Sequence, residues 1–226
     1  MILLPIAATL VALAFAVHLL VRSGHRRSWN EAVWGVAMLM FAAASGALAL
    51  GVADGWSSAE FRVYWLFGAV LNVPYLALGE VYLLVRRRWV GHVALAILLA
   101  ATAWAAGEVR SAPLDTEVLR SEEFFAGREV LGEDAAARTL AFVFSYTGTA
   151  VLVLGILWSA MAMRGRPDLR GRFNGTLLIA LGALIVAGGA AFAAAGSFAG
   201  FSLTLAVGIS VMYWGFLTAT RSVRPG

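Results

Sequence analysis

Few side chains in the apolar stretches of this sequence can do chemistry, and Glu80 is the strongest candidate. It is the only acidic residue inside the seven apolar segments described below. A charged side chain at mid-membrane costs about 3 kcal/mol, so such residues usually face a protein interior or water. Six residues, or about 9 Å of helix, separate Glu80 from Arg86. As a functional acid, Glu80 would donate a hydrogen bond or shuttle a proton. The alternative is a structural carboxyl group bonded to a rim arginine or a neighbouring helix.

Two histidines at a similar depth suggest a metal or haem site. His18 and His92 each lie four residues from an arginine, Arg22 and Arg88, which is about 6 Å along a helix. With Glu80 near the same level, the two rings could ligate a metal ion or a b-type haem if they face each other. Histidines without a ligand are common near the membrane surface. We therefore keep His18 and His92 as a minor alternative and otherwise assign no metal and no cofactor.

Further polar residues predict the walls of a cavity. Pro74 removes a backbone donor and tends to kink its helix, and kinked helices with polar neighbours often border substrate cavities. Glu80 lies about 140° from Tyr75 on a helical wheel, so one wall holding both needs a wide cavity or a register shift at the proline. Serine and threonine can instead bond back to their own helix. The residues predicted to line the cavity are Asn72, Tyr75, Ser145, Tyr146, Thr149 and Tyr213.

The composition is that of a membrane protein. Apolar residues make up 61% of the 226 positions, charged residues only 13%, and the mean hydropathy is +0.83. A soluble domain has about 25% charged residues. The chain has no cysteine, which excludes disulfides and thiolate sites, and no lysine, so a retinal Schiff base is impossible. No motif of a seven-helix family stands out.

The hydropathy pattern predicts an all-α bundle of seven transmembrane helices in one domain, 1–226. About 20 apolar residues are needed to cross the hydrocarbon core. The predicted spans are 2–21, 32–52, 63–85, 90–106, 139–163, 176–195 and 199–218. Only Gly196, Ser197 and Phe198 separate the last two spans. No charged side chain precedes the first span, which fits an uncleaved anchor better than a signal peptide.

The arginines predict the orientation. Twelve of them follow the odd-numbered spans, and cytoplasmic loops carry such an excess. We therefore expect an exported N-terminus, a cytoplasmic C-terminus and a plasma membrane location, the inner membrane in a bacterium. This placement also explains the net charge of +4 without a nucleic acid partner. The twelve are Arg22, Arg26, Arg27, Arg86, Arg87, Arg88, Arg164, Arg166, Arg170, Arg172, Arg221 and Arg224.

The segment 107–138 is the only sizeable loop and carries most of the acidic residues. Asp115 is a plausible helix N-cap and Gly127 a plausible helix end. Leu114, Val118, Leu119 and Phe125 then share one face. This pattern predicts a short amphipathic helix on the outer leaflet or over the bundle. A lid or a docking site for another subunit is the alternative.

Small residues indicate how one span packs, and tryptophans indicate where the membrane surfaces lie. Ala183, Ala187, Ala191 and Ala195 recur every four positions beside several glycines, which predicts that the sixth span packs on several neighbours and lies centrally. A homodimer seam is the alternative. Four tryptophans near the span ends read as an interfacial belt: Trp29, Trp34, Trp56 and Trp89.

These features support two classes of function. The first is a non-enzymatic bundle, either a transporter-like or ligand-binding protein or an accessory subunit of a membrane complex. Its partners would be membrane lipids and a second copy or another membrane subunit. The second is an intramembrane enzyme that acts on a lipid or isoprenoid, with Glu80 as general acid and aromatic faces stabilising a cation.

Overall fold

The computed structural model describes residues 2–85, 87–120, 127, 129–132, 135–165 and 169–221, with the backbone alone at residue 221. Within these ranges every regular element is a helix, and seven helices are long and apolar enough to cross a membrane. The predicted all-α, seven-helix architecture is confirmed. Each predicted span lies inside an observed helix apart from single terminal residues. Arg86, Phe125, Arg166 and Arg224 lie outside the described residues.

Six of the crossings are single helices: α1 (Leu3–Arg26), α2 (Trp29–Asp54), α5 (Arg88–Ser111), α7 (Ala136–Met163), α8 (Arg170–Ala194) and α9 (Phe198–Arg221). The third crossing is built from three pieces in sequence: α3 (Ser58–Val63), the π-helix η1 (Tyr64–Leu71) and α4 (Asn72–Leu84). A short helix, α6 (Thr116–Arg120), lies in the long loop.

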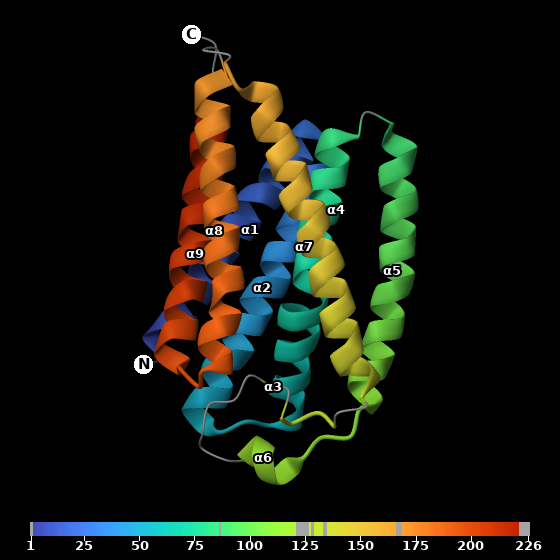
Figure 1. The fold of residues 1–226 in the computed structure, drawn as a ribbon, viewed down its shortest axis with the longest axis vertical. Coiled ribbons are helices and arrows are strands. Elements are labelled where there is room, and N and C mark those ends of the chain that lie inside the picture. Colours follow the sequence, from blue (N-terminus) through green and yellow to red (C-terminus); the bar gives the residue numbers. More distant parts are fainter. Residues whose placement is uncertain are drawn as a thin grey trace.

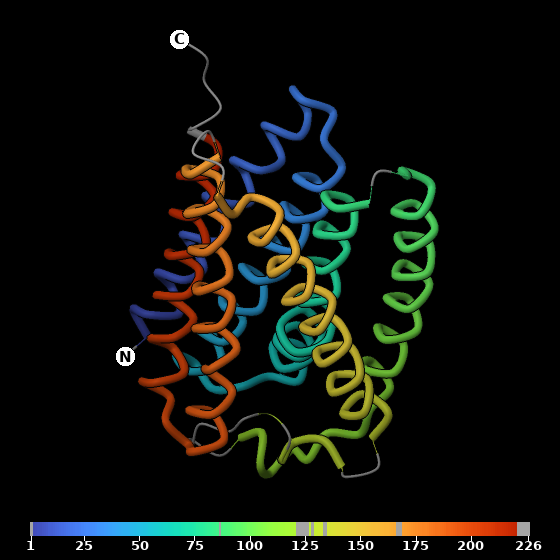
Figure 2. The backbone as a smooth tube through the Cα atoms, turned by 45° about the horizontal axis from the view of Figure 1, so that its top comes forward, coloured from blue at the N-terminus to red at the C-terminus, as the bar shows by residue number. Residues whose placement is uncertain are grey.

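The third crossing occupies the interior of the bundle. It packs against α2, α5 and α7, while α1 packs against α2 and α9 (Figures 1 and 2). Helix α5, the fourth crossing, is peripheral and exposes large apolar side chains such as Ile97 and Trp104. Most of the described arginines gather where α1 and α7 end and where α5 and α8 begin, at the top of Figure 1. We call this the arginine-rich end.

The eighth and ninth helices form a tight antiparallel hairpin with glycine at its seam. A Cβ built on Gly175 would lie 2.6 Å from the carbonyl oxygen of Gly215, and one on Gly182 would lie 2.5 Å from that of Gly208. These glycines recur every seven residues on both helices, so the two backbones touch along the seam. In lipid, such close approach is a main source of helix association.

The prediction of a central sixth span is wrong. The corresponding helix, α8, contacts α9 along its length and α7 only in part. Ala187, Ala191 and Ala195 are exposed, and only Ala183 of the predicted stripe turns inward. The glycine face made the contact instead, because glycine permits a closer backbone approach than alanine.

The π-helix changes the register of the third crossing just before Pro74. The backbone N–H of Asn72 donates to the carbonyl of Phe67, five residues back. Pro74 has no N–H, so the turn before it has fewer donors than acceptors. The hydroxyl of Ser145 on α7 supplies a donor to the carbonyl oxygen of Ala69 at 2.7 Å. Such π-segments are frequent at functional sites.

The long loop closes the other end of the bundle. Asp115 caps α6, because its Oδ1 accepts hydrogen bonds from the N–H groups of Glu117 and Val118. Leu119 is buried, so the short helix lies over the bundle and not on the leaflet alone. The predicted cap at Asp115 is confirmed. Gly127 has a φ of +89° beside Trp65, a backbone conformation that favours glycine.

Candidate functional site

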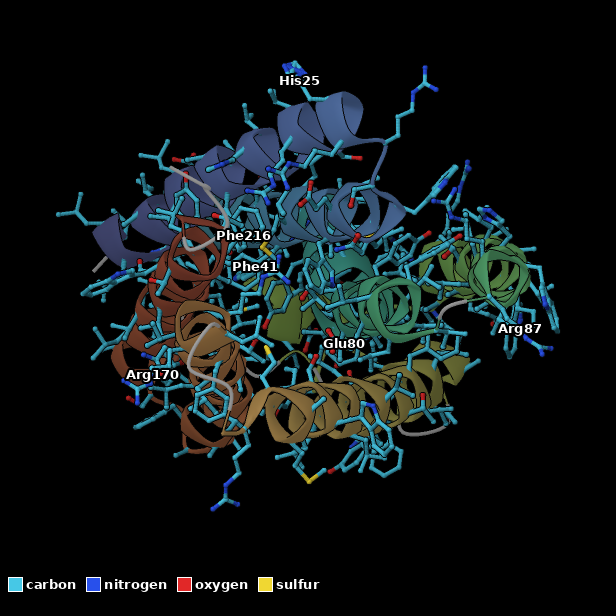
Figure 3. All side chains as sticks on the ribbon, turned by 90° about the horizontal axis from the view of Figure 1, so that it is seen from above. His25, Phe41, Glu80, Arg87, Arg170 and Phe216 are labelled. Atoms are coloured by element: carbon cyan, nitrogen blue, oxygen red, sulfur yellow. The ribbon has the colours of Figure 1, made fainter. Side chains whose placement is uncertain are left out.

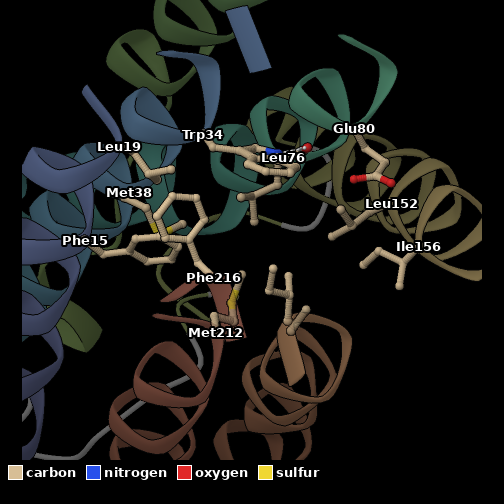
Figure 4. A pocket seen from close by; sticks show the side chains of 12 residues that line it. Phe15, Leu19, Trp34, Met38, Leu76, Glu80, Leu152, Ile156, Met212 and Phe216 are labelled. Carbon is tan, nitrogen blue, oxygen red and sulfur yellow. Dashed lines mark hydrogen bonds between the residues drawn. The ribbon is translucent and has the colours of Figure 1, made fainter. Parts of the chain in front are cut away.

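A small apolar cavity lies where six of the seven crossings meet, with α5 the exception. Its volume is about 30 Å³, which is room for one or two waters. Phe15 and Phe216 lie on one side of this space and Glu80 on the other (Figure 4). Each of the six helices contributes two residues: Phe15, Leu19, Trp34, Met38, Leu76, Glu80, Leu152, Ile156, Ile179, Ala183, Met212 and Phe216.

Glu80 is the only acidic or basic residue in this lining. It is 3% exposed, and Figure 3, viewed from the arginine-rich end, shows it toward the middle of the bundle while Arg87 and Arg170 lie at the rim. Its side chain runs across Gly155 of α7, where a Cβ would overlap the Cγ of Glu80. No residue in the described part of the chain forms a hydrogen bond or ion pair with its carboxyl group. A buried carboxyl group without a partner is costly and marks a candidate site.

The other polar side chains of the third crossing are used to hold neighbouring helices. Asn72 donates from Nδ2 to the carbonyl oxygen of Ala37 on α2 at 2.7 Å. The hydroxyl groups of Tyr75 and Thr102 are 3.2 Å apart. Since Thr102 gives its own hydrogen to a backbone carbonyl of α5, Tyr75 is the donor of this pair. Trp65 donates from Nε1 to the carbonyl oxygen of Ala137 on α7 at 3.1 Å.

None of the six residues predicted to line a cavity lines this one, whereas the candidate acid Glu80 does. Asn72, Tyr75 and Ser145 bind other helices as described above. Tyr146 is 65% exposed and packs against Phe142 on the outer face of α7. Thr149 is half-buried, and Tyr213 stacks on Phe15 with ring centroids 4.8 Å apart. Helix packing took up Asn72, Tyr75 and Ser145, because hydroxyl and amide groups in lipid must find partners.

The two histidines are not brought together. His18 on α1 lies beside Tyr213 of α9, with 3.3 Å between Nδ1 and the hydroxyl oxygen. His92 on α5 lies 2.9 Å from the Tyr82 hydroxyl and packs against Trp29. Each ring has its own aromatic partners on different helices. His18 and His92 therefore do not form the shared metal or haem site that their similar depth suggested. The described residues hold no cluster of three or more potential metal ligands.

Two residues at or near the cavity were not predicted there from the sequence. Glu31 is 7% exposed and accepts a hydrogen bond from Nε of Arg22 at 2.8 Å. Glu31 precedes its predicted span by one residue. An acid and an arginine on either side of the short α1–α2 link were the sequence signal that could have suggested this ion pair. Trp34 was assigned to the interfacial belt, but it lines the cavity and donates from Nε1 to the carbonyl oxygen of Leu76. Gly79 makes room for its indole, which a Cβ there would overlap.

Comparison with protein-family models, curated proteins and solved structures finds no match for this chain.

Proposed function

We propose that the chain is a transporter-like, ligand-binding membrane protein whose central cavity receives an amphipathic molecule at Glu80. The observation that carries this proposal is the carboxyl group of Glu80, buried in an apolar cavity without a partner among the described residues. A carboxyl group kept in such a place costs stability, and a ligand that supplies its missing contact would offset that cost.

The lining supports a particular class of ligand. Five of the six contributing helices present only apolar or aromatic side chains. The one N–H group among them, on the Trp34 indole, already donates to the carbonyl oxygen of Leu76. Such walls select an apolar body, and the single carboxyl group selects one hydrogen-bond donor or positive charge. The rings of Phe15, Trp34 and Phe216 in the same lining also suit a cation. We therefore favour an amine or hydroxyl group on an apolar chain.

The present cavity is smaller than such a ligand, so binding requires a wall to move. The α8–α9 hairpin is the best candidate, because its most extensive contacts are internal and it meets the rest of the bundle chiefly along α1 and α7. Ile179, Ala183, Met212 and Phe216 line the cavity from this hairpin. Movement of the hairpin as a unit would widen the space without breaking the glycine seam.

The orientation proposal follows the arginines. We place the arginine-rich end in the cytoplasm, with the N-terminus outside, in the plasma membrane. Lipids then surround the exposed faces of α5 and α8, and a second copy or another subunit remains a candidate partner there. Reporter fusions after Arg27 and after Arg221 test this placement, and a periplasmic or extracellular signal from either one contradicts it.

Ligand binding is tested by a matched set of probes. Decylamine, decanol and decyl sulfate share one apolar chain and differ in the polar group. We expect decylamine, and to a smaller extent decanol, to raise the midpoint of thermal unfolding of the purified protein, and decyl sulfate to give no such increase. Native mass spectrometry of gently solubilised protein identifies the natural ligand independently.

The control variants isolate Glu80. Glu80→Gln keeps the shape but removes the ionisable group, and we expect it to abolish the preference for decylamine. Glu117→Gln changes an exposed acid of the outer loop and leaves that preference intact. Equal stabilisation by all three probes, or an unchanged preference in Glu80→Gln, contradicts binding at Glu80.

An intramembrane enzyme is the second candidate function, favoured by the three aromatic rings in the lining. In that case Glu80 acts as general acid on a lipid or isoprenoid. Loss of product formation from isoprenoid substrates in Glu80→Gln supports it. The absence of any product in the unmodified protein, together with reversible binding, favours the ligand-binding proposal.

A further inference from the structure

An ion pair lies next to the cavity at the arginine-rich end. Arg22, near the end of α1, donates from Nε to Oε1 of Glu31, in the first turn of α2, at 2.8 Å. The two side chains are 19% and 9% exposed, respectively. The pair is the only ion pair within the described part of the chain. Neither residue belongs to the cavity lining.

The helical register places this pair one turn beyond the cavity. Leu19 lines the cavity from α1, and Arg22 follows it by three residues. Trp34 lines the cavity from α2, and Glu31 precedes it by three residues. Residues three apart lie on the same helix face, about 4.5 Å apart along the axis. The ion pair therefore forms the layer between the cavity and the arginine-rich end.

Arg22 also holds an aromatic ring of the cavity wall. Its Cζ lies 5.4 Å from the centroid of the Phe216 ring, which is a cation–π distance. Phe216 lines the cavity from α9, and its ring packs against Phe15 with centroids 5.3 Å apart. One guanidinium group thus connects α1, α2 and the movable α9.

The ion pair uses only part of its bonding capacity. Oε2 of Glu31 is buried and has no hydrogen-bond partner among the described residues. Arg22 makes one hydrogen bond to the carboxylate where its fork could make two. A single hydrogen bond costs less to break than a bidentate pair. The contact is therefore easier to open than a bidentate pair would be.

From these contacts we propose that Arg22, Glu31 and Phe216 form a gate that closes the cavity toward the arginine-rich end. Opening separates Arg22 from Glu31 and releases the Phe216 ring, so that α9 can move away from α1 and α2. The gate concerns access to the cavity, and it stands whether or not a ligand binds at Glu80.

The absence of cysteine from the chain allows a direct test. Met212→Cys places a thiol in the cavity wall, and Ser202→Cys places one at a fully buried position elsewhere on α9. Each variant is reconstituted in vesicles. A charged, membrane-impermeant methanethiosulfonate reagent is then added from one side at a time, and modification is followed by mass spectrometry.

We expect slow modification of Met212→Cys from both sides when the gate is intact. Adding Glu31→Gln or Arg22→Gln accelerates the reaction about tenfold from the arginine-rich side alone, because either change removes the ion pair. The two variants test the same contact independently, so failure of one to fold leaves the other. In the exchanged pair, Arg22→Glu with Glu31→Arg, an ion pair can form again. Met212→Cys is therefore modified more slowly in that background than in Glu31→Gln.

Two controls separate a gate from general loosening. Arg26→Gln removes an exposed arginine at the same end of α1 and leaves the rate unchanged. Ser202→Cys stays unreactive in the Glu31→Gln background. The proposal is overturned if neither pair variant accelerates modification of Met212→Cys, if the acceleration comes from the opposite side, or if Ser202→Cys is accelerated equally.

Discussion

Two seams of the bundle solve the problem of helix association in lipid in opposite ways. The α8–α9 seam brings backbones together through glycine, with Gly175 and Gly182 facing Gly215 and Gly208. The seam between the third crossing and α7 uses polar groups instead, as the bond from Ser145 to the carbonyl of Ala69 shows. The glycine seam is dense, whereas the polar seam borders the cavity and carries Glu80.

The difference indicates where change of shape is possible. A glycine seam gains from continuous close contact and loses much of it with any separation. A seam built from a π-segment, a proline and a few hydrogen bonds leaves irregular space beside it. Function is therefore expected at the polar seam, while the glycine hairpin keeps its internal contacts and moves as one unit.

The largest predicted effect comes from filling the glycine seam. Gly182→Leu forces the side chain against the carbonyl of Gly208 and should lower the free energy of unfolding by about 3 kcal/mol. Gly188→Leu is the matched control on the same helix, because a Cβ there meets nothing within 4 Å. Unfolding in mixed detergent measures both. Equal losses in the two variants contradict the glycine seam.

A smaller effect is expected at the polar seam. Ser145→Ala removes the donor to the Ala69 carbonyl and should cost about 1 to 2 kcal/mol, because the turn before Pro74 is short of donors. Thr147 lies two residues after Ser145 on α7, and its hydroxyl bonds only to its own helix. Thr147→Ala should therefore change the free energy of unfolding little. The same unfolding assay compares them, and a loss in Thr147→Ala as large as in Ser145→Ala would remove the distinction.

The smallest effect has the opposite sign. Glu80→Met replaces the unpartnered carboxyl group by an apolar chain of similar length and should raise the free energy of unfolding by about 1 kcal/mol. Asn72→Leu, which removes a buried group bonded to α2, should lower it by about 1 kcal/mol. Destabilisation by Glu80→Met would show that the carboxyl group supports the fold.

Glu80 shows how far a sequence can identify a site. One acid in an apolar span is conspicuous, because its insertion cost is known without any knowledge of its neighbours. Its cavity was not predictable, since the other eleven lining residues are ordinary apolar or aromatic residues from six helices. The six polar residues expected to line a cavity do not line this one. Three of them, Asn72, Tyr75 and Ser145, bond to neighbouring helices instead.

Glu31 and Trp34 illustrate the same limit from the other side. Both sit near the start of α2, where interfacial residues are common, and the position of Trp34 alone suggested a membrane surface. Only the packing of α2 against α1 and α4 turns them inward, to Arg22 and to the carbonyl of Leu76.

The number of crossings and their approximate limits follow from the sequence, because the cost of placing polar residues in hydrocarbon acts on each segment separately. The cost of Glu80 in its span follows in the same way. Which face of each helix meets a neighbour depends on packing: the glycine face of α8, the π-shifted register of the third crossing, and the meeting of twelve residues around one cavity. Those choices depend on shape complementarity between segments far apart in the chain, which the local energy of any one segment does not contain.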